Sequence, residues 1–364
     1  MKITRPTIME VDLNALEHNI KEITKYIGPN NTIMPIIKAN AYGTYINNKI
    51  DILNQFSIVG VAITDEAVDL RKNGYKKEIF ILNQPYKTEI DKIIEYNLTI
   101  GLSDISFLEE LGKRKEPIKV HIEIDTGMNR TGIKYNEINF FIQKIKKYKN
   151  IIIEGIYTHL SSADYDTEYT NQQLDYFCKA LNEAKNILGD IKYIHTSASN
   201  GLLNYPTNFT NLVRPGLILY GYDTYKEVKE KINIKPICKL KSKITFLKTV
   251  EKDSSISYSR TYITTKETKI ATIPIGYADG LPRNLSNKGY VIINNQIVPI
   301  IGNICMDSFM ADVTSLNNVN IGDDVYIWDN QLITLEDIAN QTNTINYEII
   351  CTISNRVPRV YTKV

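Results

Sequence analysis

Apolar, β-branched runs alternate with helical patterns through the first two thirds of this 364-residue chain. This alternation limits the fold more than any other feature, because strands separated by helices favour a parallel sheet that the helices cover. Helical patterns lie between most of the runs. Strands are expected at residues 32–38, 57–63, 78–82, 98–102, 118–124, 151–158, 193–196 and 217–220.

The helical stretches have boundaries typical of helix ends. Residues 65–73 stop at Gly74, a residue type that favours the C-terminal cap, and residues 88–96 begin with Thr88, which favours the N-terminal cap. An opening helix is expected at residues 13–26, directly behind Asp12. Further helices are expected at residues 104–111, 136–148 and 169–188.

Eight strands that alternate with helices predict an α/β fold. We expect an N-terminal domain, residues 1–232, that is a (β/α)8 TIM barrel. A doubly wound open sheet is the alternative that the pattern alone leaves open. No GxGxxG motif follows an expected strand, which argues against a Rossmann dinucleotide site.

The sequence pattern changes after residue 232. Short strands are expected at residues 238–249, 268–275, 290–293, 296–301, 309–313 and 324–328, with one helix at residues 335–341. Turn residues separate several of these strands. Residues 233–364 are therefore predicted to form a mainly β C-terminal domain, and residues 1–10 are left open as partners of its sheet.

Composition excludes several classes of protein. The chain has 43 basic and 41 acidic side chains, a net charge of +2, and no polybasic tract, so nucleic acid is not expected as a partner. Its four cysteines form no CxxC pair, which argues against a zinc site or a disulfide framework and fits a reducing compartment. No apolar run approaches the roughly 18 residues of a membrane span, and no signal-peptide core is present, so we expect a cytoplasmic protein.

The chemically active groups of such a barrel lie at the C-terminal ends of its strands. Lys38 ends the first expected strand, and a small-residue loop containing Tyr42 follows it. This position suits an amine that forms a Schiff base. Each candidate alone could be a surface charge, a core histidine or a helix cap, and only their joint placement on one rim favours catalysis. The other candidates on this rim are Arg130, His159, Ser199 and Arg214.

Several longer motifs resemble the alanine racemase family, pyridoxal-phosphate enzymes with a barrel followed by a β domain. The motifs follow the family's order and cover nearly the whole chain. They are KANAYG at 38–43, DTGMNR at 125–130, YTH at 157–159, SY at 257–258, IPIGYADG at 273–280, GNICMD at 302–307, NYE at 346–348 and RVPR at 356–359. A narrower pattern at residues 195–206 and 302–305 resembles the serine/alanine racemases of vancomycin-resistance clusters.

The resemblance implies that pyridoxal 5'-phosphate is the cofactor and that Lys38 binds it covalently. Arg214 would face the pyridine nitrogen. Because a guanidinium cannot give up its proton, the ring would stay unprotonated and be a weaker electron sink, which suits reprotonation better than transamination. The other cofactor contacts that the resemblance implies are Tyr42, His159, Ser199, Gly216, Leu217 and Asn355.

The reaction implied is interconversion of L- and D-alanine, of L- and D-serine, or of both, which supplies D-amino acids for peptidoglycan precursors. Racemisation needs a base on each face of one carbon. Lys38 would be one base and Tyr258 of the partner subunit the other, so a homodimer would be the active form. Arg130 and the Met306 backbone amide would face the substrate carboxylate, and no metal is implied.

Two positions depart from the family's pattern. Glu123 stands where relatives often have a carbamylated lysine that orients the arginine matching Arg130, and the glutamate side chain is much shorter. Asn355 stands where a tyrosine is common. The smaller amide would leave a roomier, more polar pocket that admits a hydroxymethyl group, so we expect serine activity beside alanine activity.

Other interpretations stay open at this point. The chain could be a plain alanine racemase without serine activity, or a basic amino-acid decarboxylase built on the same barrel, with Cys305 as its candidate cysteine. A non-catalytic pyridoxal-phosphate carrier would lack the second domain. The chain is also compatible with being the cytoplasmic domain of a membrane-anchored parent.

Overall fold

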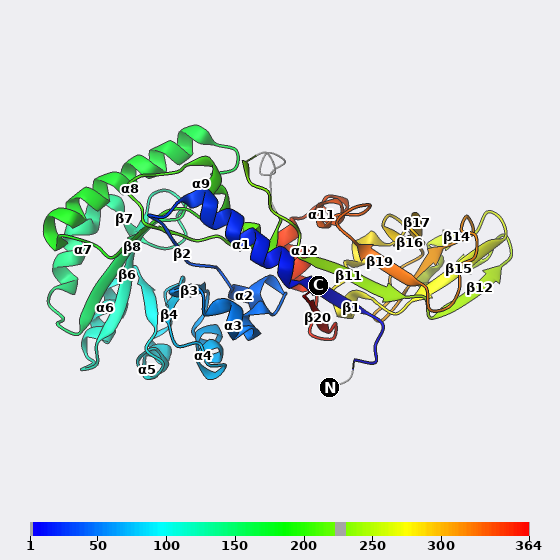
Figure 1. Ribbon diagram of the computed structural model, residues 1–364, viewed down its shortest axis with the longest axis horizontal. Coiled ribbons are helices and arrows are strands. Elements are labelled where there is room, and N and C mark those ends of the chain that lie inside the picture. The colour runs from blue at the N-terminus through cyan, green and yellow to red at the C-terminus, as the bar shows by residue number, and fades with distance from the viewer. Residues whose placement is uncertain (1–2, 223–230, 364) are drawn as a thin grey trace.

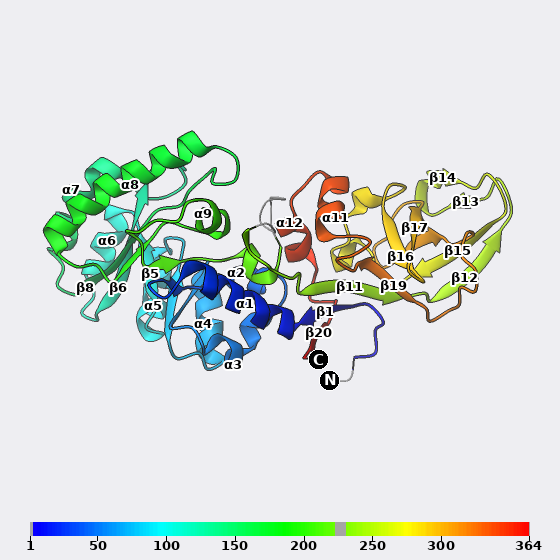
Figure 2. The same cartoon turned by 45° about the horizontal axis from the view of Figure 1, so that its top comes forward.

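The computed structural model describes residues 3–222 and 231–363 and shows two domains side by side (Figures 1 and 2). The first domain is a curled parallel sheet with helices around it, and the second is mainly β. In the described part of the chain, no helix is both long and apolar enough to cross a lipid bilayer.

Six parallel strands form the main sheet of the first domain, in the order β3-β4-β5-β6-β8-β9. A separate pair, β2 with β10, completes the ring: Gly60 N donates to the Pro35 carbonyl beside β3, and Arg214 N donates to the Ser197 carbonyl beside β9. The barrel prediction is thereby confirmed against the open-sheet alternative. The strands are β2 (Thr32–Ile33), β3 (Ile58–Val61), β4 (Glu78–Ile81), β5 (Thr99–Leu102), β6 (Ile118–Asp125), β7 (Ile133–Lys134), β8 (Ile151–Tyr157), β9 (Tyr193–His195) and β10 (Leu212–Val213).

The eighth strand was wrongly placed by the sequence pattern. Residues 217–220 form the 3-10 helix η4 (Leu217–Tyr220), and the barrel strand is β10, which comes before Arg214 instead of after it. All four residues of η4 are buried. A short run that is apolar throughout reports burial and does not distinguish a strand from a helical turn.

Helices surround the barrel as the sequence pattern predicts, and Asp12 caps the first of them by accepting from the backbone N–H groups of Asn14 and Ala15. After the first barrel strand the helices are short. The helices of the first domain are α1 (Leu13–Ile27), α2 (Lys38–Tyr42), α3 (Ile50–Leu53), α4 (Thr64–Lys72), α5 (Ile90–Glu95), α6 (Ile105–Gly112), α7 (Ile138–Ile145), α8 (Thr167–Leu188) and α9 (Ser199–Asn204).

The second domain contains a nine-stranded sheet in the order β12-β15-β18-β17-β16-β19-β11-β1-β20. The single strand expected at residues 238–249 is two strands, β11 and β12. The strand β1 (Ile8–Asp12) pairs antiparallel with β11 and parallel with β20. The other elements are β11 (Cys238–Lys243), β12 (Phe246–Val250), β13 (Ser255–Ile256), β14 (Tyr262–Ile263), β15 (Thr268–Ile273), β16 (Tyr290–Ile293), β17 (Gln296–Ile301), β18 (Phe309–Asp312), β19 (Asp324–Trp328), α11 (Leu335–Thr342), α12 (Asn346–Thr352) and β20 (Arg359–Thr362).

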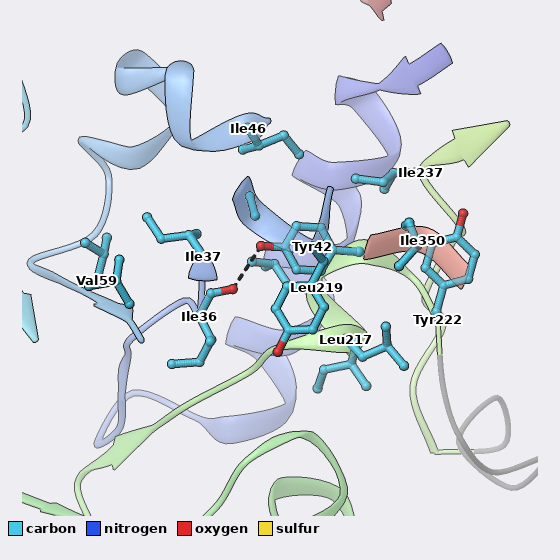
Figure 3. Packing of buried hydrophobic residues seen from close by; sticks show 14 of the residues in the cluster. Ile36, Ile37, Tyr42, Ile46, Val59, Leu217, Leu219, Tyr222, Ile237 and Ile350 are labelled. Carbon is cyan, nitrogen blue, oxygen red and sulfur yellow. Dashed lines mark hydrogen bonds between the residues drawn. The ribbon is translucent and has the colours of Figure 1, made fainter. Parts of the chain in front are cut away.

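The two domains share a core beneath the barrel mouth. Figure 3 shows Tyr42 packed among Leu217, Leu219 and Ile350, so that α2, η4 and α12 meet there. Arg359, which belongs to the second domain, stabilises the same junction through hydrogen bonds. Its guanidinium donates to four backbone carbonyls, those of Gly43 at 2.8 Å and of residues 353, 354 and 357 at 2.6 Å each.

Removing this arginine tests how much the junction contributes to stability. Arg359→Ala is expected to lower the free energy of unfolding by about 3 kcal/mol, because several half-buried carbonyls lose a charged donor. Arg114→Ala is the matched control, since Arg114 makes an exposed ion pair with Asp91, and should cost less than about 1 kcal/mol. Urea unfolding, followed by the fluorescence of the single tryptophan, Trp328, measures the free energy of unfolding of both variants. Equal losses of stability in the two variants would contradict the role of Arg359 at the junction.

Candidate active site

Lys38 lies at the mouth of the barrel and begins a left-handed turn. The four residues after it, Ala39, Asn40, Ala41 and Tyr42, have φ angles between 52° and 56°. Left-handed helical backbone costs a non-glycine residue roughly 1–2 kcal/mol. Strained backbone of this kind persists where the surroundings fix it, and it concentrates at functional sites.

Contacts from distant parts of the chain hold the turn. The carboxylate of Glu66, on α4, accepts a hydrogen bond from Ala39 N at 2.6 Å. Arg359 donates to the Gly43 carbonyl, and the Tyr361 hydroxyl donates to the Thr44 carbonyl at 3.1 Å. The position of Lys38 is therefore set by both domains.

The surroundings of Lys38 favour its neutral amine. Partial burial lowers the pKa of the ammonium, and the positive charge of Arg130 lowers it further. Glu66 and Cys351 oppose this shift. A lowered pKa increases the fraction of the amine that can act as a nucleophile or a base near neutral pH.

Tyr42, Ser199 and Gly216 line a small polar recess beside Lys38. Gly216 N donates to Ser199 Oγ at 3.1 Å, and burial raises the pKa of the Tyr42 phenol, which stays a proton donor. A Cβ at position 216 would lie 2.5 Å from Tyr42 Oη and 3.9 Å from Ser199 Oγ. Only glycine leaves this space open, and hydroxyl and amide donors around it fit a phosphate group. We call these three residues the phosphate cradle.

Arg214 is buried at the end of β10, with 2% of its surface exposed. One of its terminal nitrogens binds His195 Nδ1 at 2.8 Å. The other donates to the Thr158 and Thr196 carbonyls, at 2.9 and 3.0 Å, and lies 3.2 Å from His159 Nδ1. Burial lowers the pKa of Arg214 to about 10, so the guanidinium remains charged near neutral pH.

His159 faces the same side of the barrel. Burial, together with the positive charges of Arg214, Arg130 and Lys38, lowers the pKa of His159 to about 3. The imidazole is therefore neutral and can accept from Arg214. A small cavity next to it, of about 10 Å³, is lined by Glu123, Ile124, Asp125, Met128, Arg130, Thr131, Thr158 and His159.

Glu123 does not orient Arg130 directly. Its Oε1 accepts from Thr131 Oγ1 at 2.9 Å, while its buried Oε2 has no hydrogen-bond partner among the described residues. Within residues 3–222 and 231–363, no ion pair joins Glu123 to Arg130. Burial raises the pKa of the Glu123 carboxyl, which weakens its tendency to carry the negative charge that a carbamylated lysine would bring.

Tyr258 and Met306 form a second group, separate from the barrel mouth. Tyr258 is 71% exposed and Met306 is 52% exposed. The Asn303 side chain donates to the Tyr258 carbonyl at 2.8 Å, and Ser257 Oγ donates to the Asn303 carbonyl, so this loop is braced within the second domain. Tyr258 follows β13, which lies at the end of the second domain farthest from the barrel (Figure 2). One chain therefore does not bring Tyr258 to Lys38.

Asn355 is exposed and follows α12, the helix that packs on the Lys38 turn. The hydrogen bonds of Arg359 to the carbonyls on either side of it tie this segment to Gly43. The second domain thus ties the segment that contains Asn355 to Gly43 of its own chain and presents Tyr258 elsewhere.

Two residues that matter for the site were not singled out as candidates from the sequence. Glu66 supports the strained turn, and a glutamate at the third position of a helix is a recognisable capping signal, although the signal does not reveal what else it binds. His195 contacts Arg214 and lies one residue before the end of the strand expected at residues 193–196, close to the kind of position that marked the other candidates.

Two family models match the chain. "Alanine racemase, N-terminal domain" covers residues 11–224, and "Alanine racemase, C-terminal domain" covers residues 237–361. The alanine racemase of Halothermothrix orenii is 38% identical over 370 residues, 99% of this chain and 98% of that protein. The alanine racemase of Methanococcus maripaludis is 40% identical over 374 residues, 99% of both chains.

Solved structures give the same result. An alanine racemase of Clostridium difficile 630 superposes with a TM-score of 0.93 at 34% identity, covering 99% of this chain and 97% of that one. The alanine racemase of Bacillus anthracis with bound L-Ala-P has a TM-score of 0.93 at 32% identity, covering 100% of this chain and 96% of that one. Because the similarity includes the second domain, it argues against a carrier or a barrel decarboxylase. The chain belongs to the alanine racemase family, whose members are pyridoxal-phosphate-dependent isomerases.

Proposed function

We propose that this protein interconverts L- and D-alanine, and also racemises serine, by a two-base mechanism in a homodimer. The observation that supports this most strongly is that Lys38, the phosphate cradle and the buried guanidinium of Arg214 gather at one mouth of the barrel, where the charge of Arg214 acts on Lys38. These groups match the amine, the phosphate and the ring nitrogen that pyridoxal phosphate needs.

Lys38 would hold the cofactor aldehyde, the cradle its phosphate, and Arg214 its ring nitrogen. When bound, this cofactor withdraws electrons from the α-carbon of an amino acid and makes the α-proton removable. Lys38 would then move that proton on one face of the substrate. Its lowered pKa brings the amine closer to the operating pH, where a general base works best.

Tyr258 would act on the opposite face, from the partner subunit. Its high exposure within one chain and its distance from the barrel mouth fit a side chain that completes a neighbour's site. Met306 belongs to the same exposed loop region, and its backbone amide would face the substrate carboxylate together with Arg130. His159 and Leu217 would complete the cofactor's surroundings.

Serine activity rests on Asn355. The exposed amide lies in a segment tied to the barrel mouth, where it can bond a substrate hydroxyl. We propose a cytoplasmic protein that supplies D-amino acids for peptidoglycan. The sequence likeness to the serine/alanine racemases of vancomycin-resistance clusters also supports serine activity. The Asn355→Tyr experiment below tests both.

Lys38→Ala is expected to abolish the near-ultraviolet absorption band of a covalently held pyridoxal cofactor, because it removes the amine that would form the bond. Absorption spectra of purified holoprotein measure this. Lys72→Ala, an exposed lysine on α4, is the control and should keep the band. A Lys38→Ala protein with an unchanged band would disprove the assignment of Lys38.

Hybrid dimers test the shared site. Lys38→Ala and Tyr258→Phe proteins should each be inactive, since each lacks one base. After subunit exchange at equal amounts, about one quarter of the wild-type sites should recover, because half of the dimers are mixed and each has one intact site. No recovery, with exchange verified by differently tagged subunits, would place both bases in one chain or remove Tyr258 as a base.

Asn355→Tyr tests substrate choice. Loss of the amide should lower the ratio of kcat/KM for serine to that for alanine by about tenfold, roughly 1.4 kcal/mol in differential transition-state binding. Steady-state assays with both amino acids measure the ratio. If cofactor affinity changes while the ratio stays constant, Asn355 is only a phosphate contact and the protein is a plain alanine racemase.

A further inference from the structure

Two histidines that the proposed mechanism does not use lie beneath Arg214, inside the barrel. His195, on β9, and His121, on β6, are both fully buried. Arg214 contacts His195 Nδ1 at 2.8 Å, and His195 Nε2 lies 2.9 Å from His121 Nδ1. The three side chains therefore form one continuous hydrogen-bonded line from the barrel mouth toward its interior.

The chemistry of the groups fixes the direction of every bond in this line. Arginine has only donors, so His195 Nδ1 must accept. Burial and neighbouring positive charges lower the pKa of both histidines, to about 3 for His121, so each ring is neutral and has one N–H. The proton of His195 is then on Nε2, His121 Nδ1 accepts it, and the proton of His121 is on its own Nε2.

Tight packing holds both rings in these orientations. Tyr157 stacks on His195 with parallel rings 4.9 Å apart, and Phe80 stacks on His121 at 4.4 Å. A Cβ on Gly155 would lie 2.7 to 2.8 Å from three atoms of the His121 ring. Neither ring has room to turn over without moving its neighbours.

The line ends in an acidic group. A ring nitrogen of His121 and carboxylate oxygens of Glu78 and Glu154 lie within 4.8 Å of one another, and His121 Nε2 has no hydrogen-bond partner among the described residues. Lys192 Nζ is 3.2 Å from Glu78 and 3.1 Å from Glu154. Because His121 Nε2 has the proton, it offers no lone pair to a metal ion, so this group is not a metal site. The carboxylates lie near the N–H end of the line without a hydrogen bond to it.

We propose that His195 and His121 are positioning residues that hold the Arg214 guanidinium through a one-directional hydrogen-bond relay. The N–H dipoles of both rings point away from the cation, so their negative ends face it and stabilise its charge in a site without a carboxylate contact from any described residue. The second terminal nitrogen is held by the Thr158 and Thr196 carbonyls, so the guanidinium plane is fixed from two sides. This inference rests on the proposed role of Arg214 toward the ring nitrogen.

The relay makes a prediction that simple core packing does not make. In His121→Leu, His195 Nε2–H loses its acceptor, so the proton can move to Nδ1 and would then oppose the Arg214 cation. In His121→Asn, the amide oxygen takes the place of Nδ1 and keeps the acceptor. The polar variant should therefore function better than the apolar one, although a buried site that only needs packing favours leucine.

The experiment compares the holoprotein of both variants with wild type. His121→Leu should lower kcat for alanine by about tenfold and shift the absorption maximum of bound pyridoxal phosphate, while His121→Asn stays within about twofold of wild type. Tyr75→Phe is the control, since it removes a buried hydrogen bond to the Phe56 carbonyl elsewhere in the barrel. It should lower Tm without changing the absorption maximum or kcat.

A second readout does not depend on activity. The chain has only four histidines, so 15N NMR of histidine-labelled protein can assign the proton of each ring. His195 and His121 should both have it on Nε2, with or without cofactor. If either His195 or His121 is charged in the wild type, or has its proton on Nδ1, the proposal is overturned, and this readout does not require a variant to fold. An equal loss of kcat in His121→Leu and His121→Asn would also overturn it. A wild type that does not bind pyridoxal phosphate or racemise alanine would instead disprove the proposed function.

Discussion

A buried positive charge determines much of this structure. Arg214 is placed at the mouth of the barrel by a strand of only two residues, β10, and it is surrounded by backbone carbonyls and neutral imidazoles. A buried cation without compensation would cost several kcal/mol, so its surroundings must supply acceptors. The strand ends that provide the Thr158 and Thr196 carbonyls are the same ends that place His159 and His195, and this shared origin explains why the groups lie together.

The strained backbone directly after Lys38 is the second feature on which the site depends. The left-handed turn after Lys38 directs the chain back over the barrel, so that Tyr42 reaches Gly216 and forms the cradle. Such a turn is stable only because Glu66 and Arg359 bind its backbone. Arg359 comes from the second domain, so the lysine position depends on how the two domains pack. At the junction, the second domain therefore stabilises the barrel mouth of its own chain. Under the proposed function, the far end of the same domain presents Tyr258 to the partner subunit.

The sequence predicted the barrel and the mainly β second domain because both depend on periodic patterns, which a single chain displays. It also placed Lys38 and His159 at the ends of expected strands, but it put Arg214 ahead of a strand at residues 217–220 that the structure does not have. It misplaced the last strand at residues 217–220, since a short apolar run shows burial without showing conformation. The left-handed turn and the two-residue strand β10 were not predicted, and β2 is only the first two residues of the strand expected at residues 32–38. The geometry of these segments comes from hydrogen bonds between parts of the chain that are far apart in sequence. The contact of His195 with Arg214 likewise depends on the closed ring of strands.

The most direct test of the two-base account follows the α-hydrogen in the Tyr258→Phe protein. The holoprotein is incubated in deuterium oxide with L-alanine and, separately, with D-alanine, and 1H NMR records deuterium entry while chiral analysis records inversion. With Lys38 as the only remaining base, one enantiomer should exchange its α-hydrogen, the other should not, and inversion should fall by at least about a hundredfold. Equal exchange of both enantiomers, or inversion near the wild-type rate, would contradict the assignment of one base to each domain.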